Sequence, residues 1–371
     1  MAGTVVVTAA TGSLGRRVCA RIAADPAVTR VIAIDRPGVP AAAEAVPAAG
    51  VPAAAVTHHR IELVDPELKR LCEGADAIVH LGAGAPLTSP EVTLDGTGSS
   101  GDVEGTRALL AVAADAGVRT LVVLSSAMVY GAWPNNPVPL TEAAPLRPAA
   151  ELPFAVEKAE IERLAAAWRA EQAGAGAEIN GVRVAILRPA ISVGPESETW
   201  LGRSPWSNAG LTVHEAEPPV QFVHLDDVAT AVDIARRQRL DGAFNVAPDG
   251  WLTGRARRDL TGPTAQVKLP AGVAERVASF RWKFGLTGTP PSVLPYTMYS
   301  WVVANDRLKA TGWLPRHTNE EAFVEADPGG ALSTMTPARR QQLSLAALGA
   351  VVAGVVVAGL GALRAARRRT H

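Results

Sequence analysis

The stretch VVVTAATGSLGRRV, residues 5–18, decides the fold. An apolar run without polar alternation leads through a turn of small residues into a helical pattern, the order of a buried strand followed by a helix. Gly12 allows a ligand close to the backbone, and Gly15 allows the helix to pack near the strand. The amides of such a turn and the positive end of its helix suit a pyrophosphate. The turn residues predicted to bind a cofactor are Thr8, Thr11, Gly12, Ser13, Leu14 and Gly15.

An acidic residue ends the next predicted strand. Asp35 follows the glycines by the separation of about 20 residues that is typical of dinucleotide-binding units. A carboxylate there accepts both ribose hydroxyls and favours NAD, whereas the adjacent Arg36 suits a 2′-phosphate and leaves NADP open. The alternative interpretation is an ordinary turn capped by small residues. The register of strand, glycines, helix and acid favours dinucleotide binding.

Apolar runs and helical stretches alternate through the first half of the chain. The predicted strands are Thr4–Thr8, Arg30–Asp35, Ala77–Leu81, Thr120–Ser125 and Val182–Arg188, and the predicted helices are Leu14–Ala24, Asp102–Ala116 and Phe154–Glu171. Continuous apolar strands separated by helices indicate a parallel sheet covered on both faces. We therefore expect an α/β, doubly wound, Rossmann-like domain over residues 1–195. A smaller substrate region, residues 196–326, is expected to return strands to the same sheet.

Composition and charge exclude several classes of protein. Lysine plus arginine equals aspartate plus glutamate, 36 against 36, so no global charge indicates a nucleic-acid partner. A hydrophobic fraction of 48% excludes a disordered chain. Cys19 and Cys72 are too few for a disulfide framework, and none of the seven histidines has zinc-site spacing, so no metal is expected.

Several ordered motifs together resemble the extended short-chain dehydrogenase/reductase family, the NAD-dependent epimerases and dehydratases. TAATGSLG is similar to the family's Thr-Gly-x-x-Gly-x-x-Gly turn, with Ala9 in place of the first glycine. The other similar segments are ADAIVHLGA (75–83), VEGTRALL (103–110), LVVLSSAMVYG (121–131), ILRPAISVGP (186–195) and FVHLDDVA (222–229). The resemblance covers residues 4–315. It implies NAD as cofactor and a small-molecule substrate, often a nucleotide sugar.

The same resemblance implies roles for individual residues. Asp65 resembles the acid that contacts the adenine, and Ser126 the catalytic serine. The end of the 75–83 segment, which passes under the cofactor in the family, supplies Leu81, Gly82 and Ala83. In VEGTRALL the position of the family's Asn-x-x-Gly-Thr asparagine is not clear.

The sequence departs from the family at the centre of the active site. The family has Tyr-x-x-x-Lys on a helix, where the lysine holds the nicotinamide ribose and lowers the pKa of the phenol. The matching segment, LPFAVEKAEIERL (152–164), has Phe154 at the tyrosine position and retains Lys158. Because phenylalanine cannot exchange a proton, the usual mechanism requires a substitute group. Ser126, Tyr130, Glu157 and His214 are the candidates.

Three functions follow from these motifs. The leading one is an NAD(P)-dependent oxidoreductase, epimerase or dehydratase, with Ser126 polarising a substrate oxygen. A second is a sensor or scaffold that binds the dinucleotide without turnover, and a third is a sterol or lipid dehydrogenase. In the substrate region, Trp200 or Trp206 is suited to cover a base or an apolar substrate, although core filling explains most tryptophans. Candidates for a diphosphate are Arg203 and Arg255–Arg258.

The C-terminal stretch LSLAALGAVVAGVVVAGLGAL, residues 343–363, contains Ser344 as its only polar side chain. As a helix it would extend about 31 Å, which matches a hydrocarbon core of roughly 30 Å. We expect a single-pass transmembrane helix after a linker (327–342) and before a basic tail (364–371), rather than a buried helix of a soluble protein. Small residues four apart along it would allow a homodimer contact, namely Ala350, Gly354, Ala358 and Ala362.

The orientation of this anchor rests on two opposing signals. Four arginines after the helix and two before it favour a cytoplasmic tail and an external main domain. The N-terminal sequence MAGTVVVTAATG has no signal-peptide pattern, and a nicotinamide cofactor is expected in the cytoplasm. We therefore expect a membrane-attached protein whose main domain is cytoplasmic.

Overall fold

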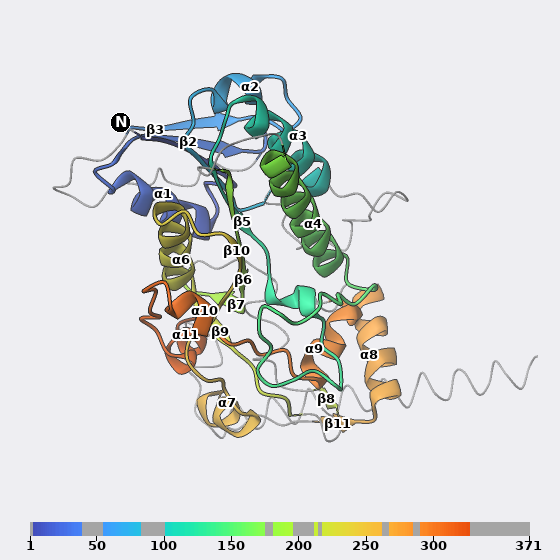
Figure 1. The fold of residues 1–371 in the computed structure, drawn as a ribbon. Helices are drawn as coiled ribbons and strands as arrows, with labels where there is room; N and C mark the ends of the chain where they lie inside the picture. Colours follow the sequence, from blue (N-terminus) through green and yellow to red (C-terminus); the bar gives the residue numbers. More distant parts are fainter. Residues whose placement is uncertain are drawn as a thin grey trace, which may run out of the picture.

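A computed structural model describes residues 3–38, 55–82, 101–174, 181–195, 211–213, 217–261, 267–284 and 290–326 of the chain. Its centre is a seven-stranded parallel sheet in the order β10-β6-β5-β4-β1-β2-β3 (Figure 1). The strands are β1 (Gly3–Thr8), β2 (Val28–Asp35), β3 (Ala55–Arg60), β4 (Ala77–His80), β5 (Thr120–Leu124), β6 (Arg183–Pro189) and β10 (Gly242–Val246). The predicted doubly wound, Rossmann-like sheet is confirmed.

Helices cover both faces of this sheet (Figure 1). On one face α1 (Ser13–Ala23) packs against α6 (Leu225–Arg237). On the other, α3 (Gly101–Asp115) contacts both α2 (Glu67–Cys72) and α4 (Pro153–Gly174). Helix α1 buries Val18, Cys19 and Ile22, the three- and four-residue spacing of an amphipathic helix, against the sheet.

The strand order reverses between β1 and β4, and this reversal positions the site. β1 pairs in parallel with β2 on one side and with β4 on the other. The connections that follow β1 and β4 therefore diverge to opposite faces, which leaves a crevice at the carboxyl ends of the two strands. Ligands of open α/β sheets bind at such a point.

The remaining elements form the second region, below the sheet in Figure 1. Two short parallel pairs occur there, β7 (Ile191–Val193) with β9 (Phe222–His224), and β8 (Leu211–Val213) with β11 (Val267–Leu269). The helices are α7 (Gly254–Thr261), α8 (Ala271–Lys283), α9 (Leu294–Met298), α10 (Asp306–Lys309) and α11 (Asn319–Ala326), with short 3-10 turns η1 (Ala127–Tyr130) and η2 (Pro291–Val293).

The predicted anchor, its linker and the basic tail lie outside the described residues. Within the described residues, no helix combines the length and the apolar character needed to cross a bilayer.

Candidate functional site

The turn between β1 and α1 is shaped by one glycine and one strained alanine. A Cβ atom on Gly15 would lie 2.2 Å from the carbonyl oxygen of Ala9, so only glycine lets α1 pass this close to the end of β1. Ala9 itself adopts φ +51°, the left-handed region that favours glycine. The alanine that replaces the family's first glycine therefore adopts the backbone conformation that a glycine would take more easily.

The N-terminus of α1 is open to an anion. Gly12 is the N-cap, so no side chain caps the helix, and the first turn contains no acidic residue. A Cβ on Gly12 would meet only the Ala9 carbonyl oxygen, at an ordinary 3.6 Å. The fold thus tolerates a side chain at position 12. A pyrophosphate bound to the first-turn amides would not tolerate one, because the side chain would take up its space. Thr8, Ser13 and Leu14 border the same turn.

Asp35 is buried at the end of β2 and bonded to the turn. Its Oδ1 accepts the backbone N–H of Thr11 at 3.1 Å and the Thr11 hydroxyl at 3.0 Å. The carboxylate is thus held at the edge of the crevice, where the adenosine ribose of a dinucleotide belongs.

Arg36 lies between two carboxylates. Its guanidinium is 3.6 Å from Glu62 and 3.7 Å from Asp102. Both separations are longer than hydrogen bonds, and a 2′-phosphate would compete with these two carboxylates for the guanidinium. Asp65, the residue predicted to contact adenine, is exposed and instead accepts the N–H of Glu67 at 2.8 Å, at the start of α2. Glu62, which the sequence analysis did not single out, is the acid beside Arg36.

The end of β4 is fixed by a buried histidine. His80 bridges the hydroxyls of Thr8, 2.9 Å from Nδ1, and Thr106, 3.0 Å from Nε2. Burial, reinforced by the charge of Lys158, lowers the pKa of His80 to about 4, so the ring is neutral near pH 7. Leu81 and Gly82 follow it, and Gly82 has φ +114°. Ala83 lies outside the described residues.

Lys158 of α4 reaches the same point from the opposite side. Its Nζ lies 3.2 Å from the place a Cβ on Gly82 would take, and Asp102 Oδ2 lies 3.6 Å from that place. Lys158 is 7% exposed. Asp102 precedes Gly105 and Thr106 at the spacing of the family's Asn-x-x-Gly-Thr pattern, so an aspartate occupies the position that the sequence left unassigned. A cationic and an anionic group thus both lie beside Gly82.

Glu157 adds a second carboxyl group to this cluster. Burial, reinforced by the charge of Asp102 and opposed by the charges of Lys158 and Arg36, raises its pKa to about 7. Its Oε1 is buried without a hydrogen-bond partner. Glu157 therefore exchanges its proton near neutral pH.

Phe154 occupies the tyrosine position on α4. Its half-buried ring packs against the core, and its centroid lies 5.9 Å from Lys158 Nζ. Ser126 follows β5 and is 6% exposed, and its Oγ accepts the N–H of Met128 at 3.2 Å as the N-cap of η1. The predicted serine thus lies at the start of η1, and the lysine and aromatic positions lie on α4, which contacts η1.

The hydroxyls of two tyrosines are engaged elsewhere. Tyr130 donates to Asn245 Oδ1 at 2.8 Å and accepts from Arg188 at 2.8 Å, and burial raises its pKa. Arg188 is itself paired with Glu162, which accepts the Ser125 hydroxyl at 2.5 Å. Tyr296 donates to the Met128 carbonyl at 2.9 Å, and burial raises its pKa as well. Tyr130 is therefore a structural residue in this arrangement.

Part of the predicted substrate region is not described. Trp200, Arg203, Trp206 and His214 lie outside the described residues. The candidate cations Arg255–Arg258 fall on α7, where Arg258 forms an ion pair with Glu217.

The family model for the NAD dependent epimerase/dehydratase family matches residues 5–247. The chain belongs to this family. The match includes the β1–α1 turn, β4, β5 with Ser126 after it, and α4. The residues of this site therefore belong to a protein of the extended short-chain type. An uncharacterized protein of Mycobacterium tuberculosis is 26% identical to this family member over 344 residues, covering 91% of this chain and 86% of that protein.

Two solved structures of similar fold are complexes with ligands. A UDP-glucose 4-epimerase of Thermus thermophilus in complex with NAD has a TM-score of 0.61 and 22% identity, covering 87% of this chain and 97% of that one. A Tyr-to-Phe variant of UDP-glucuronic acid 4-epimerase from Bacillus cereus, in complex with NAD and a 4-deoxy-4-fluoro nucleotide sugar, has a TM-score of 0.61, 15% identity and the same coverage. At these identities the likeness is one of fold.

Proposed function

We propose that this protein is an NAD-dependent oxidoreductase of the epimerase/dehydratase kind that acts on a nucleotide sugar. The observation that carries the proposal is the position of Lys158, whose Nζ meets the Gly82 bend at the switch point between β1 and β4. A lysine buried at this point is suited to hold a ribose of the cofactor. The similar structures solved in complex with NAD, one of them also with a nucleotide sugar, support the same chemistry.

The residues of the crevice favour NAD over NADP. Asp35 stands where a ribose hydroxyl would be accepted, and Arg36 is drawn between Glu62 and Asp102. Three carboxylates around the adenosine end would repel a 2′-phosphate. The open N-terminus of α1 and the bare Gly12 fit the pyrophosphate.

Bound NAD would accept or return a hydride at a hydroxyl-bearing carbon of the substrate. In this proposal Ser126 hydrogen-bonds the substrate oxygen, and Lys158 orients the cofactor ribose. Phe154 excludes water from one side of the site and holds no proton. The hydroxyl proton therefore leaves through a group other than the family's phenol, and Glu157, with a pKa of about 7, is the titratable group nearest to Lys158 along α4.

A second candidate function is dinucleotide binding without turnover. The observation that favours it is that the Tyr130 and Tyr296 hydroxyls are hydrogen-bonded elsewhere, so neither replaces the missing phenol. Such a protein would sense NAD or present a bound ligand to a partner. The Tyr-to-Phe exchange in the Bacillus cereus neighbour is compatible with a complex that holds NAD and a nucleotide sugar.

We also propose that residues 343–363 anchor the protein in a membrane, with the main domain in the cytoplasm. The length and uninterrupted apolar character of the segment support this, as do the arginines on both sides. The ridge of small residues in the segment would allow two anchors to pair as a homodimer.

Calorimetric titration of the full chain with NAD, NADH, NADP and NADPH tests the cofactor site. We expect micromolar NAD binding that is lost in Asp35→Ala and Lys158→Ala, with NADP weaker by at least about tenfold. Absence of binding to the folded parent refutes both candidate functions. Conversion of UDP-glucose or UDP-glucuronic acid, followed by chromatography of the sugar nucleotide together with NADH absorbance, then separates them. An epimerase returns its hydride and accumulates no NADH, but only the oxidoreductase converts the substrate.

A further inference from the structure

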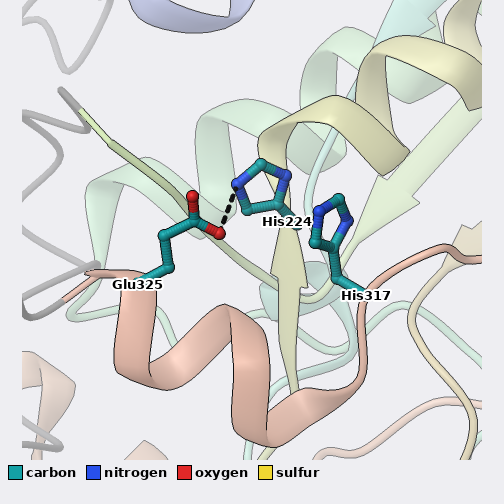
Figure 2. Close-up of side chains that lie close together, drawn as sticks. All are labelled: His224, His317 and Glu325. Atoms are coloured by element: carbon teal, nitrogen blue, oxygen red, sulfur yellow. Dashed lines mark ion pairs between the residues drawn. The ribbon is translucent and has the colours of Figure 1, made fainter.

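Two histidines and a glutamate lie close together (Figure 2), at the place where α11 and α6 both contact β9. His224 ends β9 and precedes α6, His317 precedes α11, and Glu325 lies on α11. One ligand atom of each lies within 4.8 Å of the others. We propose that these three side chains bind a divalent transition-metal ion of the zinc type, which fastens α11 to β9 and α6.

His224 presents an unsatisfied nitrogen to this cluster. Its side chain is 2% exposed, and its buried Nε2 has no hydrogen-bond partner. Nε2 points toward Glu325, with 3.3 Å between Nε2 and Oε2 (Figure 2). A buried polar atom without a partner is rare in folded proteins and is expected to have a ligand. Gly194 leaves room beside this nitrogen, since a Cβ there would lie 3.1 Å from it.

His317 is oriented for coordination by a buried carboxylate. Its Nδ1 lies 3.0 Å from Asp227 Oδ2, which also accepts the backbone N–H of His317 at 3.0 Å. Asp227 is 1% exposed. With Nδ1 bonded to the carboxylate, the lone pair is left on Nε2, which faces His224 (Figure 2). A carboxylate behind a ligating histidine is the usual outer shell of a zinc site.

His224 has a carboxylate behind it as well. In the metal-free protein Nδ1 accepts the N–H of Asp226 at 3.1 Å, which leaves the ring proton on Nε2. Coordination through Nε2 would move that proton to Nδ1. Asp226 Oδ2, 3.7 Å from Nδ1, is then the acceptor after a small rotation. The metal would therefore take the place of the proton on His224 Nε2, which moves to Nδ1. This breaks the capping hydrogen bond from the Asp226 N–H.

The distances and donor types select the ion. Zinc bonds of about 2.0–2.1 Å in a tetrahedron place ligand atoms about 3.4 Å apart, and the His224–Glu325 pair is already at 3.3 Å. The side chains of His317 and Glu325 are 27% and 43% exposed, so both can rotate by the remaining distance. Two imidazoles and one carboxylate suit zinc or cobalt, whereas calcium and magnesium require oxygen ligands. Water would take the fourth position.

Metal titration of the full chain tests the site. The chelator-treated parent is titrated with Zn²⁺ by calorimetry and with Co²⁺ by visible absorption, which reports tetrahedral coordination. We expect Glu325→Gln and His317→Ala to weaken one equivalent of binding by at least about tenfold, since even an outer-shell partner contributes 10- to 100-fold. The matched control is Glu320→Gln, the same exchange on an exposed residue of α11, which should bind as the parent does.

Thermal unfolding supplies the second measurement. At a Zn²⁺ concentration that saturates the parent, the unfolding midpoint should rise equally in the parent and in Glu320→Gln, and by clearly less in Glu325→Gln. Should His317→Ala fail to fold, the comparison between Glu325→Gln and Glu320→Gln decides alone. Equal zinc affinity in these two variants, or no zinc binding by the parent, would overturn the proposal. Neither measurement depends on NAD or on catalysis.

Discussion

The ring of Phe154 and the ammonium group of Lys158 lie on one face of α4, with 5.9 Å between the ring centroid and Nζ. Their separation of four residues gives them this shared face. The aromatic ring and the lysine of the family site are therefore retained, and the phenolic proton is not. A single oxygen atom separates this arrangement from a proton-transferring one.

Phe154→Tyr restores that oxygen beside Lys158. We expect conversion of UDP-glucose or UDP-glucuronic acid to increase by about 10²-fold or more, the usual contribution of a positioned acid or base. Chromatography of the sugar nucleotide measures it, with absorbance at the NADH band as a second readout. The control is Phe280→Tyr on α8, whose ring is 54% exposed, and this variant should match the parent. If the parent binds NAD and the UDP-sugar but only the Phe154→Tyr variant turns over, the parent is the dinucleotide-binding protein of the second candidate function.

Tyr130→Phe tests whether the buried hydroxyl of Tyr130 takes part in catalysis. The exchange removes a hydroxyl bonded to Asn245 Oδ1 and Arg188 Nη1, so each of these buried atoms loses one hydrogen bond, while Arg188 keeps its pairing with Glu162. We expect a loss of about 1–3 kcal/mol in unfolding free energy and an unchanged rate of UDP-sugar conversion per folded molecule. Denaturant unfolding and chromatography of the sugar nucleotide measure the two effects. A rate that falls while the fold is intact would make Tyr130 the substitute acid or base.

Alanine substitutions at the two glycines of the first turn should have different effects, one on the stability of the fold and the other on NAD affinity. In Gly15→Ala the new methyl group would lie 2.2 Å from the Ala9 carbonyl, so α1 must move away from β1. We expect this variant to unfold at a markedly lower temperature. In Gly12→Ala the methyl group meets the same oxygen at 3.6 Å, so the fold should be kept while NAD affinity falls by at least about tenfold. Equal NAD affinity in Gly12→Ala and the parent would contradict a pyrophosphate on this turn.

The first βαβ unit could be predicted because its signals are local. The strand of residues 4–8, the glycine turn and the helix that follows are neighbours in sequence, and the observed β1 and α1 begin or end within one residue of the prediction. β3 was missed because Ala55–Arg60 lies at the sheet edge, is partly exposed and follows an alanine- and proline-rich stretch. For the strands expected to return from residues 196–326 no bounds were predicted, and β10 of that region pairs with β6.

In the site too, the residues set by local sequence could be predicted, and those brought together by tertiary contacts could not. The positions of Gly12, Gly15 and Asp35 follow from spacing within one βαβ unit, and that of Lys158 from the resemblance to the family's Tyr-x-x-x-Lys pattern. The cluster of His224, His317 and Glu325 does not, because His317 reaches His224 only when α11 packs against β9. Rules based on the spacing of histidines find sites on one hairpin or helix, and these ligands belong to distant parts of the chain.

Ala9→Gly should stabilise the protein. Ala9 has φ +51°, a conformation that disfavours an alanine by roughly 1 kcal/mol and a glycine hardly at all. We expect the unfolding midpoint to rise by about 2 °C. Ala10→Gly is the matched control, since Ala10 is buried and has no positive φ, and it should lower the midpoint. A lower midpoint in Ala9→Gly would show that the methyl group contributes more through packing than it loses through backbone strain.

Glu157→Gln should change the pH dependence of stability in a defined direction. Burial raises the pKa of Glu157 from 4.5 to about 7, so the folded protein keeps a proton that the unfolded chain releases above pH 4.5. The parent therefore loses stability, relative to Glu157→Gln, as the pH rises from about 4.5 to about 7, and the difference is constant above that. Allowing for the partial exposure of the carboxyl group, we expect roughly 1 kcal/mol in favour of the glutamine variant at pH 8 and almost none at pH 4.

Glu160→Gln on the same helix should show the opposite sign. The hydrogen bond from Arg163 holds the pKa of Glu160 below its usual value. Its carboxylate therefore stabilises the fold above pH 4.5, and this contribution is lost as the pH falls through the folded-state pKa. Unfolding midpoints of the parent and both variants between pH 4 and pH 8 measure the two effects. Parallel pH curves for the parent and Glu157→Gln would exclude a buried, proton-retaining Glu157, and with it this residue as the substitute for the missing phenol.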